Sequence, residues 1–382
     1  MRVAFDATAL LGRRTGIGNC TAEVIKRLPR PDLDLVAFAV SARGAGALTT
    51  MVPTGVSTVT RPMAARPLRA AWRRSNHPKI EWWTGPVDVV HGPNFVVPPS
   101  QAAEIVTIHD LTCVRFPELC TSDTLQLPSL IERAISRGAW VHTVSSFVAD
   151  EVIAHFDIDA TRVVAIPNGT TPVVAESERV ALRARARNLI DTDRYVLSLG
   201  TIEPRKDIPT LITAFELLAA ENQDVVLVIA GPDGWGSDQV ANAIEQSPVR
   251  TRIRRLGWLD DTDRDALLAG ASVFVYPSLY EGFGLPPLEA MALGTPVVAT
   301  RVGALTEVLQ GAAQWAEAGQ PESLASAIAA LLEDENHAAS LLQVGRDRIA
   351  HYDWNVTVDA LVELYATVAD DPHSGDHPRR LS

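Results

Sequence analysis

Long hydrophobic runs, paired cysteines and an excess of basic charge are all missing from this sequence of 382 residues. No apolar run approaches the ~20 residues that cross a bilayer, and no charged and apolar leader opens the chain, so we predict a cytoplasmic protein. Cys20, Cys113 and Cys120 are scattered and lack the spacing of a zinc or redox site. The net charge of −12 argues against nucleic-acid binding, because phosphate backbones require a basic surface.

What is present is the composition and length of two α/β domains. Hydrophobic residues make up 47% and charged residues 21%, which is typical of a globular chain. Short apolar, β-branched runs alternate with amphipathic stretches, a pattern that predicts parallel sheets with crossover helices. A first series lies at 3–6, 34–40, 87–91, 105–109, 140–144 and 163–166, and a second at 195–200, 225–231, 252–256, 273–276 and 296–299.

We therefore expect a first domain at residues 1–175 and a second at 190–350, each a doubly wound sheet. The charged, Ala- and Arg-rich segment that ends near Asp193 is interpreted as the connection between them. The amphipathic segment 354–368 is expected to pack back on the first domain, and the polar tail 370–382 to be disordered.

The most informative stretch is Tyr-Glu-Gly-Phe-Gly-Leu-Pro-Pro-Leu-Glu at 280–289, between a predicted strand and a predicted helix. Gly282 and Gly284 would let backbone amides converge on an anion at the start of the helix. Glu281 and Glu289 flank this turn, so both carboxylates could accept hydrogen bonds from hydroxyls of one ligand. A glycine-rich turn with a solvated glutamate at each end is the alternative, but the strand, the glycines, the prolines and the spaced acids occur together.

A second stretch, Gly-Thr-Ile-Glu-Pro-Arg-Lys at 200–206, follows the first strand of the second domain. Cations at this place can neutralise a diphosphate leaving group, whose negative charge grows as its bond to a sugar breaks. Lys206 is the stronger candidate. Arg205 either shares this task or makes a structural ion pair.

These stretches resemble the Glu-x7-Glu signature of retaining glycosyltransferases of family 4, which have the GT-B fold, and the resemblance covers nearly the whole chain. It implies two Rossmann-like doubly wound domains that face a central cleft. It also implies that Glu281 contacts hydroxyls of the donor sugar, that Glu289 contacts the nucleotide ribose, and that Lys206 binds phosphate. The amides of Gly282, Phe283, Gly284 and Leu285 would bind the diphosphate and the sugar.

The first domain offers two further candidates. Gly16 and Gly18, in a Thr-Gly-Ile-Gly-Asn turn, could approach a phosphate or an acceptor, and the missing third glycine weakens a dehydrogenase interpretation. His109 and Asp110 end a predicted strand, the usual place for site residues in an open α/β sheet, although a capped, structural histidine has the same pattern. By the resemblance, His109 faces the donor sugar. Asp110 would orient it or bind the acceptor.

The resemblance implies transfer of one sugar from a nucleoside diphosphate-sugar to an acceptor hydroxyl with retention of configuration. Mannose from GDP-mannose is the first choice, because the amino-terminal segment is similar to bacterial mannosyltransferases, and glucose from UDP- or ADP-glucose is the second. An inactive sugar-nucleotide-binding scaffold is the alternative from another class. The acceptor would be a glycan, a glycoside or a lipid-linked glycan. No metal or cofactor is expected to be obligatory, since Lys206 and backbone amides can stabilise the charge.

One basic segment stands out against the acidic total. Residues 61–79 carry no acid, and Trp82 and Trp83 follow closely. The segment would contact anionic lipid headgroups at the membrane periphery or a charged acceptor, or else it is a solvated basic loop. Its basic residues are Arg61, Arg66, Arg69, Arg73, Arg74 and Lys79.

Overall fold

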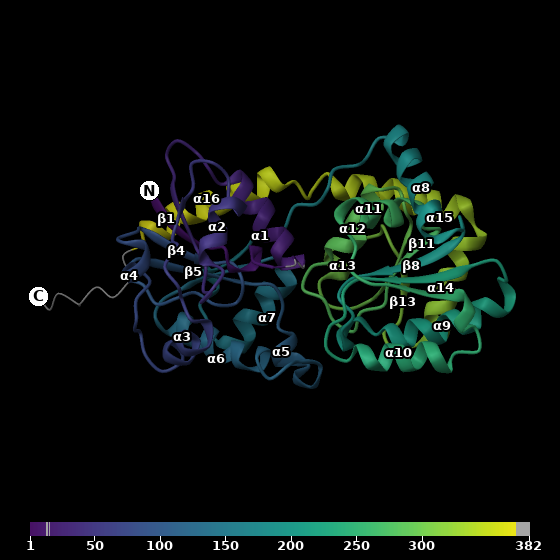
Figure 1. Cartoon of the computed structure of the whole chain (residues 1–382), viewed down its shortest axis with the longest axis horizontal. Coiled ribbons are helices and arrows are strands. Elements are labelled where there is room, and N and C mark those ends of the chain that lie inside the picture. The colour runs from purple at the N-terminus through teal and green to yellow at the C-terminus, as the bar shows by residue number, and fades with distance from the viewer. Residues whose placement is uncertain (13, 15, 372–382) are drawn as a thin grey trace, which may run out of the picture. The chain divides into compact units, whose positions relative to one another are not determined.

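The computed structural model describes residues 1–12, 14 and 16–371, which form two compact units. Unit 1 consists of Met1–Gly169 and the chain from Trp354 on, and unit 2 consists of Thr170–Asp353. Each unit has one parallel sheet with helices on both faces (Figure 1). The prediction of two doubly wound α/β sheets is therefore confirmed.

The sheet of unit 1 has the strand order β3-β2-β1-β4-β5-β6-β7, and every neighbouring pair is parallel. The order reverses between β1 and β4, so the loops after these two strands diverge and leave a crevice at the carboxyl ends. The strands are β1 (Arg2–Asp6), β2 (Asp34–Phe38), β3 (Ser57–Thr58), β4 (Val89–Gly92), β5 (Ala103–Ile108), β6 (Trp140–Thr143) and β7 (Val163–Ala165).

Helices cover both faces of this sheet. Its α-helices are α1 (Gly16–Arg27), α2 (Leu48–Met51), α3 (Ala65–Trp72), α4 (Glu81–Thr84), α5 (Thr112–Arg115), α6 (Leu127–Ser136), α7 (Ser146–Phe156) and α16 (Trp354–Ala369). Short 3-10 helices are η1 (Thr8–Leu10), η2 (Ala45–Ala47), η3 (Pro117–Leu119), η4 (Thr124–Gln126) and η5 (Ala160–Arg162). The core between sheet and helices contains aliphatic side chains together with Phe38, Met63 and Trp72.

Helix α16 belongs to unit 1 although the whole of unit 2 precedes it in sequence, and Figure 1 shows it in yellow. It packs on α1, β4 and β5 through buried residues that include Val358, Leu361 and Tyr365. Asp371, just after the helix, accepts a hydrogen bond of 3.0 Å from the indole of Trp140. The rest of the predicted tail, from position 372, lies outside the described residues.

The sheet of unit 2 has the order β10-β9-β8-β11-β12-β13 and is also parallel throughout. Its order reverses between β8 and β11, which places a second crevice at the carboxyl ends of those strands. The strands are β8 (Tyr195–Leu199), β9 (Val226–Ala230), β10 (Ile253–Leu256), β11 (Val273–Tyr276), β12 (Val297–Thr300) and β13 (Gln314–Ala316).

Helices again lie on both faces. They are α8 (Glu176–Ile190), α9 (Ile208–Glu221), α10 (Ser237–Gln246), α11 (Asp261–Gly270), α12 (Leu285–Ala292), α13 (Leu305–Val308), α14 (Pro321–Glu333) and α15 (Glu335–Ile349), with η6 (Pro204–Lys206) and η7 (Arg250–Arg252). Helices α9, α10 and α14 lie on one face of the sheet, and α8, α11, α12 and α15 lie on the other (Figure 1).

The interpretation of the segment up to Asp193 as a connection is wrong in one respect, because most of it is helix α8. Arg179, Ala186 and Ile190 are buried on one face of α8, which packs against α11. Only this narrow stripe is covered, and the remaining positions are mostly exposed, with exposed Val180 and Leu189 among them, so the sequence does not show the apolar face of a packed helix.

Candidate functional site

The crevice of unit 2 brings together the two stretches that the sequence singles out. The loop after β8 carries Arg205 and Lys206, and the loop after β11 carries Glu281. The strands β8 and β11 are hydrogen-bonded neighbours, so their carboxyl ends adjoin. The loops contact each other directly, because the backbone N–H of Leu279 donates a hydrogen bond of 2.8 Å to the carbonyl of Arg205.

Glu281 pairs with both cations. Nζ of Lys206 lies 2.6 Å from Oε1 of Glu281, and a guanidinium nitrogen of Arg205 lies 2.8 Å from Oε2. Arg205 also bonds Glu203 at 2.8 Å and donates to the carbonyl of Tyr280 at 2.9 Å. The two cations and two carboxylates form one partly enclosed network. Arg205 thus has the structural ion pairs that the sequence left as one of its alternatives.

The cluster fixes the protonation of its members. Burial alone would raise the pKa of Glu281, yet the charges of Arg205 and Lys206, with a hydrogen bond from Lys206, lower it to about 2. Burial lowers the pKa of Lys206, and the Glu281 carboxylate opposes that shift. The result at neutral pH is an ionised carboxylate against a positively charged lysine in a place with little water.

Tyr276, the last residue of β11, is a member of this cluster that was not expected from the sequence. Its hydroxyl accepts a hydrogen bond of 2.6 Å from Nζ of Lys206. Burial, followed by the Glu281 carboxylate, raises its pKa well above the usual value, so it stays a neutral phenol. The only sequence signal was its place at the carboxyl end of a strand. Tyr276, Lys206, Gly200 and Thr201 line a small hollow of about 250 Å³.

The glycine-rich turn leads into α12 as expected. Gly284 is the residue before the helix, and its φ of 116° favours glycine. No side chain caps this helix start, so the amide of Leu285 is directed away from the helix. Pro286 and Pro287 have no N–H, which limits the amide donors here to the turn itself and the first helical residue. Phe283, beside Gly282 in the turn, is buried with its ring edge-on to Tyr352, 5.5 Å between centroids.

Glu289 lies one turn further along α12, close to Arg264 of α11. Burial raises the pKa of Glu289, and the positive charge of Arg264 opposes this shift. Arg264 also bonds Asp261 at 3.0 Å and Asp265 at 2.8 Å, so three carboxylates surround one guanidinium. An arginine partner for Glu289 was not foreseen, because α11 and α12 are adjacent only in space.

In unit 1, the predicted glycine turn is instead the first turn of a helix. Gly16 begins α1, and Gly18 is buried two residues later. A Cβ atom on Gly18 would lie 2.7 Å from the carbonyl oxygen of Ala9, so only glycine fits without a shift of backbone. The preceding Thr15 lies outside the described residues. The two glycines therefore place the start of α1 close to the segment after β1.

His109 and Asp110 follow β5 at the carboxyl edge of the sheet. Nε2 of His109 is 2.7 Å from the carbonyl oxygen of Pro93 and donates to it, which leaves Nδ1 as the acceptor of the neutral ring. Burial lowers the pKa of His109, opposed by Pro93 and Asp110. Asp110 accepts a hydrogen bond of 2.9 Å from the N–H of Thr112, which starts α5. Asp110 therefore shapes the local turn, and its second oxygen is left for other contacts.

A pocket of about 350 Å³, open solvent included, lies in unit 1 at the carboxyl ends of β1, β2 and β4, where the strand order reverses. Asp6, Thr8, Arg69 and Asn94 provide its polar lining. Burial raises the pKa of Asp6 to about 6, although hydrogen bonds from Thr8 and the charge of Arg69 act in the opposite direction. None of these residues was expected to line a pocket, and Arg69 stood out in the sequence only as a member of the basic segment.

The basic segment forms α3 and the loop after it. Trp72 is buried and donates a hydrogen bond of 3.0 Å to the carbonyl of Pro78, whereas Trp82 is 71% exposed. No helix in the described part of the chain is long and apolar enough to cross a bilayer. Within the same residues, histidine, cysteine and carboxylate side chains nowhere gather in threes as metal ligands.

Two family models together match most of the chain. Residues 14–172 match the model described as Glycosyltransferase Family 4, and residues 182–348 match the model described as Glycosyl transferases group 1. The first match falls almost wholly in unit 1 and the second wholly in unit 2.

Individual relatives agree with these models. The O-antigen chain mannosyltransferase B of Escherichia coli is 30% identical over 311 residues, which is 78% of this chain and 80% of that protein. The phosphatidyl-myo-inositol mannosyltransferase of Mycolicibacterium smegmatis is 27% identical over 334 residues, 83% of this chain and 81% of that protein. Among solved structures, Anabaena HepE in complex with UDP-glucose superposes with a TM-score of 0.73 at 19% identity, covering 96% of this chain and all of that one. This likeness shows the fold, and the expected GT-B fold is confirmed.

Proposed function

Because this chain belongs to glycosyltransferase family 4, we propose that it transfers mannose from GDP-mannose to a hydroxyl group of an acceptor, with retention of configuration. The observation that supports this best is the cluster of Lys206, Arg205 and Glu281 at the crevice of unit 2. It combines positive charge for a diphosphate with a carboxylate for sugar hydroxyls. That combination is what a nucleoside diphosphate-sugar requires.

The chemistry follows from the leaving group. As the bond between the sugar and the diphosphate breaks, negative charge grows on the phosphate oxygens, and Lys206 stabilises it. The amides of Gly284 and Leu285 at the start of α12 add partial positive charge. Glu281, ionised because its pKa is about 2, accepts hydrogen bonds from sugar hydroxyls and orients the anomeric carbon.

Glu289 accepts hydrogen bonds from the ribose hydroxyls in this proposal, and His109 faces the donor sugar with Nδ1. Retention fits an attack from the face that the diphosphate leaves, with a phosphate oxygen removing the acceptor proton. In this reaction the protein supplies orientation and charge, and it needs no covalent nucleophile.

The choice of sugar depends on the relatives. The O-antigen and the phosphatidyl-myo-inositol relatives are mannosyltransferases by name, which favours mannose. The Anabaena structure holds UDP-glucose, which keeps glucosyl transfer as a second candidate. An inactive scaffold is disfavoured, because such a protein has no need for the buried pairing of Lys206, Arg205 and Glu281.

The acceptor side is assigned to unit 1. The pocket lined by Asp6, Thr8, Arg69 and Asn94 offers a carboxyl group and donors for the hydroxyls of a glycan, a glycoside or a lipid-linked glycan. Peripheral contact of the basic segment with anionic lipid at the cytoplasmic face would bring a lipid-linked acceptor close. Replacing Arg66, Arg73 and Arg74 by glutamine should then reduce binding to phosphatidylglycerol vesicles, and equal binding would refute this contact.

The first experiment measures thermal stabilisation by GDP-mannose, GDP, UDP-glucose, UDP, ADP-glucose and ADP. A ligand that binds the native state raises the melting temperature. Selective stabilisation by the guanosine compounds, followed by transfer of mannose to mannoside acceptors, supports the proposal. Preference for uridine or adenosine compounds would replace mannose by glucose, and no response from any of them would favour the scaffold.

A further inference from the structure

A second pocket in unit 1 lies at the edge of the sheet opposite to His109. It is an open pocket of about 650 Å³, open solvent included, beside the amino ends of β5 and β6, between the loop after α3 and the end of α6. Its polar lining includes Asn76, Lys79, Ser100, Glu104, Arg133 and Arg137. Three cations thus face one carboxylate, in a protein whose net charge is −12. No residue proposed for sugar transfer lines it.

One cation and the carboxylate neutralise each other. Arg137 makes a two-pronged ion pair with Glu104, with Nη2 2.6 Å from Oε2 and Nε 3.1 Å from Oε1, and both side chains are less than a tenth exposed. Glu104 also accepts a hydrogen bond of 2.9 Å from the N–H of Ser100. This pair is complete, so it forms the floor of the pocket and offers no net charge to a ligand.

Arg133 is different. Its Nη2 donates to the side-chain oxygen of Asn76 at 2.8 Å, and its Nε is buried without any hydrogen-bond partner. Among the described residues it forms no ion pair. A cation in the last turn of α6 is favoured by the helix dipole, but the dipole gives no partner to the buried Nε. A buried donor of a charged group without a partner is costly, which points to a missing acceptor.

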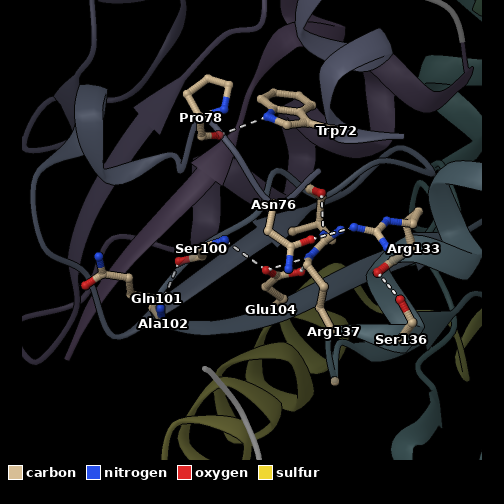
Figure 2. Close-up of polar contacts among 12 residues, drawn as sticks. Trp72, Asn76, Pro78, Ser100, Gln101, Ala102, Glu104, Arg133, Ser136 and Arg137 are labelled. Carbon is tan, nitrogen blue, oxygen red and sulfur yellow. Dashed lines mark hydrogen bonds and ion pairs between the residues drawn. The ribbon is translucent and has the colours of Figure 1, made fainter. Parts of the chain in front are cut away.

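The missing acceptor has the properties of an anion. Figure 2 shows the side chains of Asn76, Glu104, Arg133 and Arg137 pointing toward one another. The side-chain oxygen of Asn76 accepts a hydrogen bond from Arg133. The side-chain NH2 group of Asn76 can therefore donate to a ligand. The ammonium of Lys79 adds a further positive charge to the same lining. An oxyanion with several acceptor oxygens matches this set of donors, since arginine binds phosphate through paired N–H groups.

We propose that this pocket binds a phosphate group, held by the guanidinium of Arg133, the amide of Asn76 and the ammonium of Lys79. The phosphate would come from a soluble phosphate ester or from the headgroup of an anionic lipid, because both present the same oxygens. The site is separate from the donor and acceptor sites proposed above, and it does not depend on the function proposed there.

The test follows the Nε–H resonance of Arg133 by NMR in the full chain labelled with ¹⁵N-arginine, during titration with inorganic phosphate at constant ionic strength. The resonance is identified by its loss in Arg133→Gln. We expect a saturable shift of this resonance in the wild-type protein. Asn76→Asp places a carboxylate beside Arg133, so it should weaken phosphate binding at the site by about tenfold or more while keeping the protein folded. Arg43→Gln, at an exposed arginine of unit 1 outside the lining and outside the basic segment, should leave the shift unchanged.

The outcomes distinguish a lipid headgroup from a soluble ester as the source of phosphate. They also distinguish a phosphate site from an arginine that only stabilises the end of α6. Phosphatidylglycerol vesicles that displace inorganic phosphate from Arg133 identify a headgroup, and vesicles without effect identify a soluble ester; both support the site. An Arg133 resonance that stays still with phosphate, or that moves equally in Asn76→Asp, overturns the proposal and leaves Arg133 as a helix-end cation.

Discussion

Nζ of Lys206 and Oε1 of Glu281 lie 2.6 Å apart, with side chains that are 12% and 8% exposed, although the residues are 75 positions apart in the chain. Neither charge would be stable in so dry a place alone. Each residue therefore depends on the other for its protonation state. The chemistry proposed for unit 2 rests on this pair, and so do two predictions.

Lys206→Ala should lower the turnover number more than it weakens donor binding. The lysine stabilises charge that develops only as the sugar leaves, so a loss of about 10²- to 10³-fold in kcat is expected. Steady-state kinetics with the donor identified by thermal stabilisation measures both parameters. Lys26→Ala, an exposed lysine on α1, is the matched control. A rise in KM alone with normal kcat would show that Lys206 contributes only to binding.

The same pair predicts an acid-sensitive stability. Glu281 has an ordinary pKa of 4.5 and a folded-state pKa of about 2, so it stabilises the fold above about pH 4.5. That contribution should be lost as the pH falls from 4.5 towards 2. Unfolding by urea at a series of pH values measures it, and Glu281→Gln should remove this part of the pH dependence while costing roughly 3–5 kcal/mol at neutral pH. An unchanged pH profile in the variant would contradict the low pKa.

Glu289→Ala should weaken binding of the nucleoside diphosphate. Loss of hydrogen bonds from ribose hydroxyls to a charged acceptor costs about 1.5–3 kcal/mol, roughly a 10- to 100-fold rise in Kd. Because burial raises the pKa of Glu289, the wild-type affinity should also begin to fall at a higher pH than an ordinary glutamate would give. Calorimetric titration checks both effects, with the exposed Glu333→Ala as control. Equal affinities would exclude the ribose contact.

A chelator should leave activity unchanged if Lys206 and Arg205 supply the positive charge. Their pairing with Glu281 places two cations at the crevice, which is the role that a divalent ion has in other transferases. Assays after exhaustive treatment with EDTA, with and without added magnesium or manganese, measure this. Loss of activity that returns with one metal would show a metal-dependent transfer.

How much the sequence could predict depends on whether the signal is local. The glycine turn at Gly284, the strands before it and the cation at Lys206 all follow from short patterns, and the structure brings these patterns to one edge of a sheet. The edge strands β3 and β13 were not predicted, because Ser57–Thr58 is short and polar and Gln314–Ala316 has only three residues.

Side-chain partners are the other part that the sequence could not provide. The sequence around Tyr276 indicates only the end of a buried strand. It does not indicate that the hydroxyl of Tyr276 accepts a hydrogen bond from Lys206, 70 positions earlier. Arg264 likewise reads as one of several charges on α11. Such pairs arise when crossover helices and loops bring distant segments to the same strand ends, and a single sequence holds no pattern for them.

A chain of hydrogen bonds through the core of unit 1 gives a further example. Burial lowers the pKa of His91 far below its usual value and that of His142 to about 4, so both rings are neutral. Each ring then has one donor and one acceptor nitrogen, which determines the direction of every hydrogen bond in the chain. Tyr365 donates to His91 at 2.7 Å, His91 to Thr107 at 2.7 Å, Thr107 to His142 at 2.9 Å, and His142 to the carbonyl of Ile166 at 3.0 Å.

Thr107→Val should break this chain at its centre and leave two buried histidine nitrogens without partners. A loss of about 1–3 kcal/mol in the free energy of unfolding is expected, because each buried polar group loses its bond without gaining water. Thr107→Ser keeps the hydroxyl and should recover most of the loss. Denaturant unfolding of both variants measures this, and equal stabilities would show that the hydroxyl contributes nothing.

The return of α16 to unit 1 also sets an order of assembly during synthesis. Unit 2 is one continuous stretch of chain, so it can fold as soon as it leaves the ribosome. Unit 1 lacks a helix that packs on α1, β4 and β5 until residues 354–369 have emerged. Unit 1 is therefore synthesised first and completed last. Until α16 has been made, an apolar face of its sheet stays uncovered.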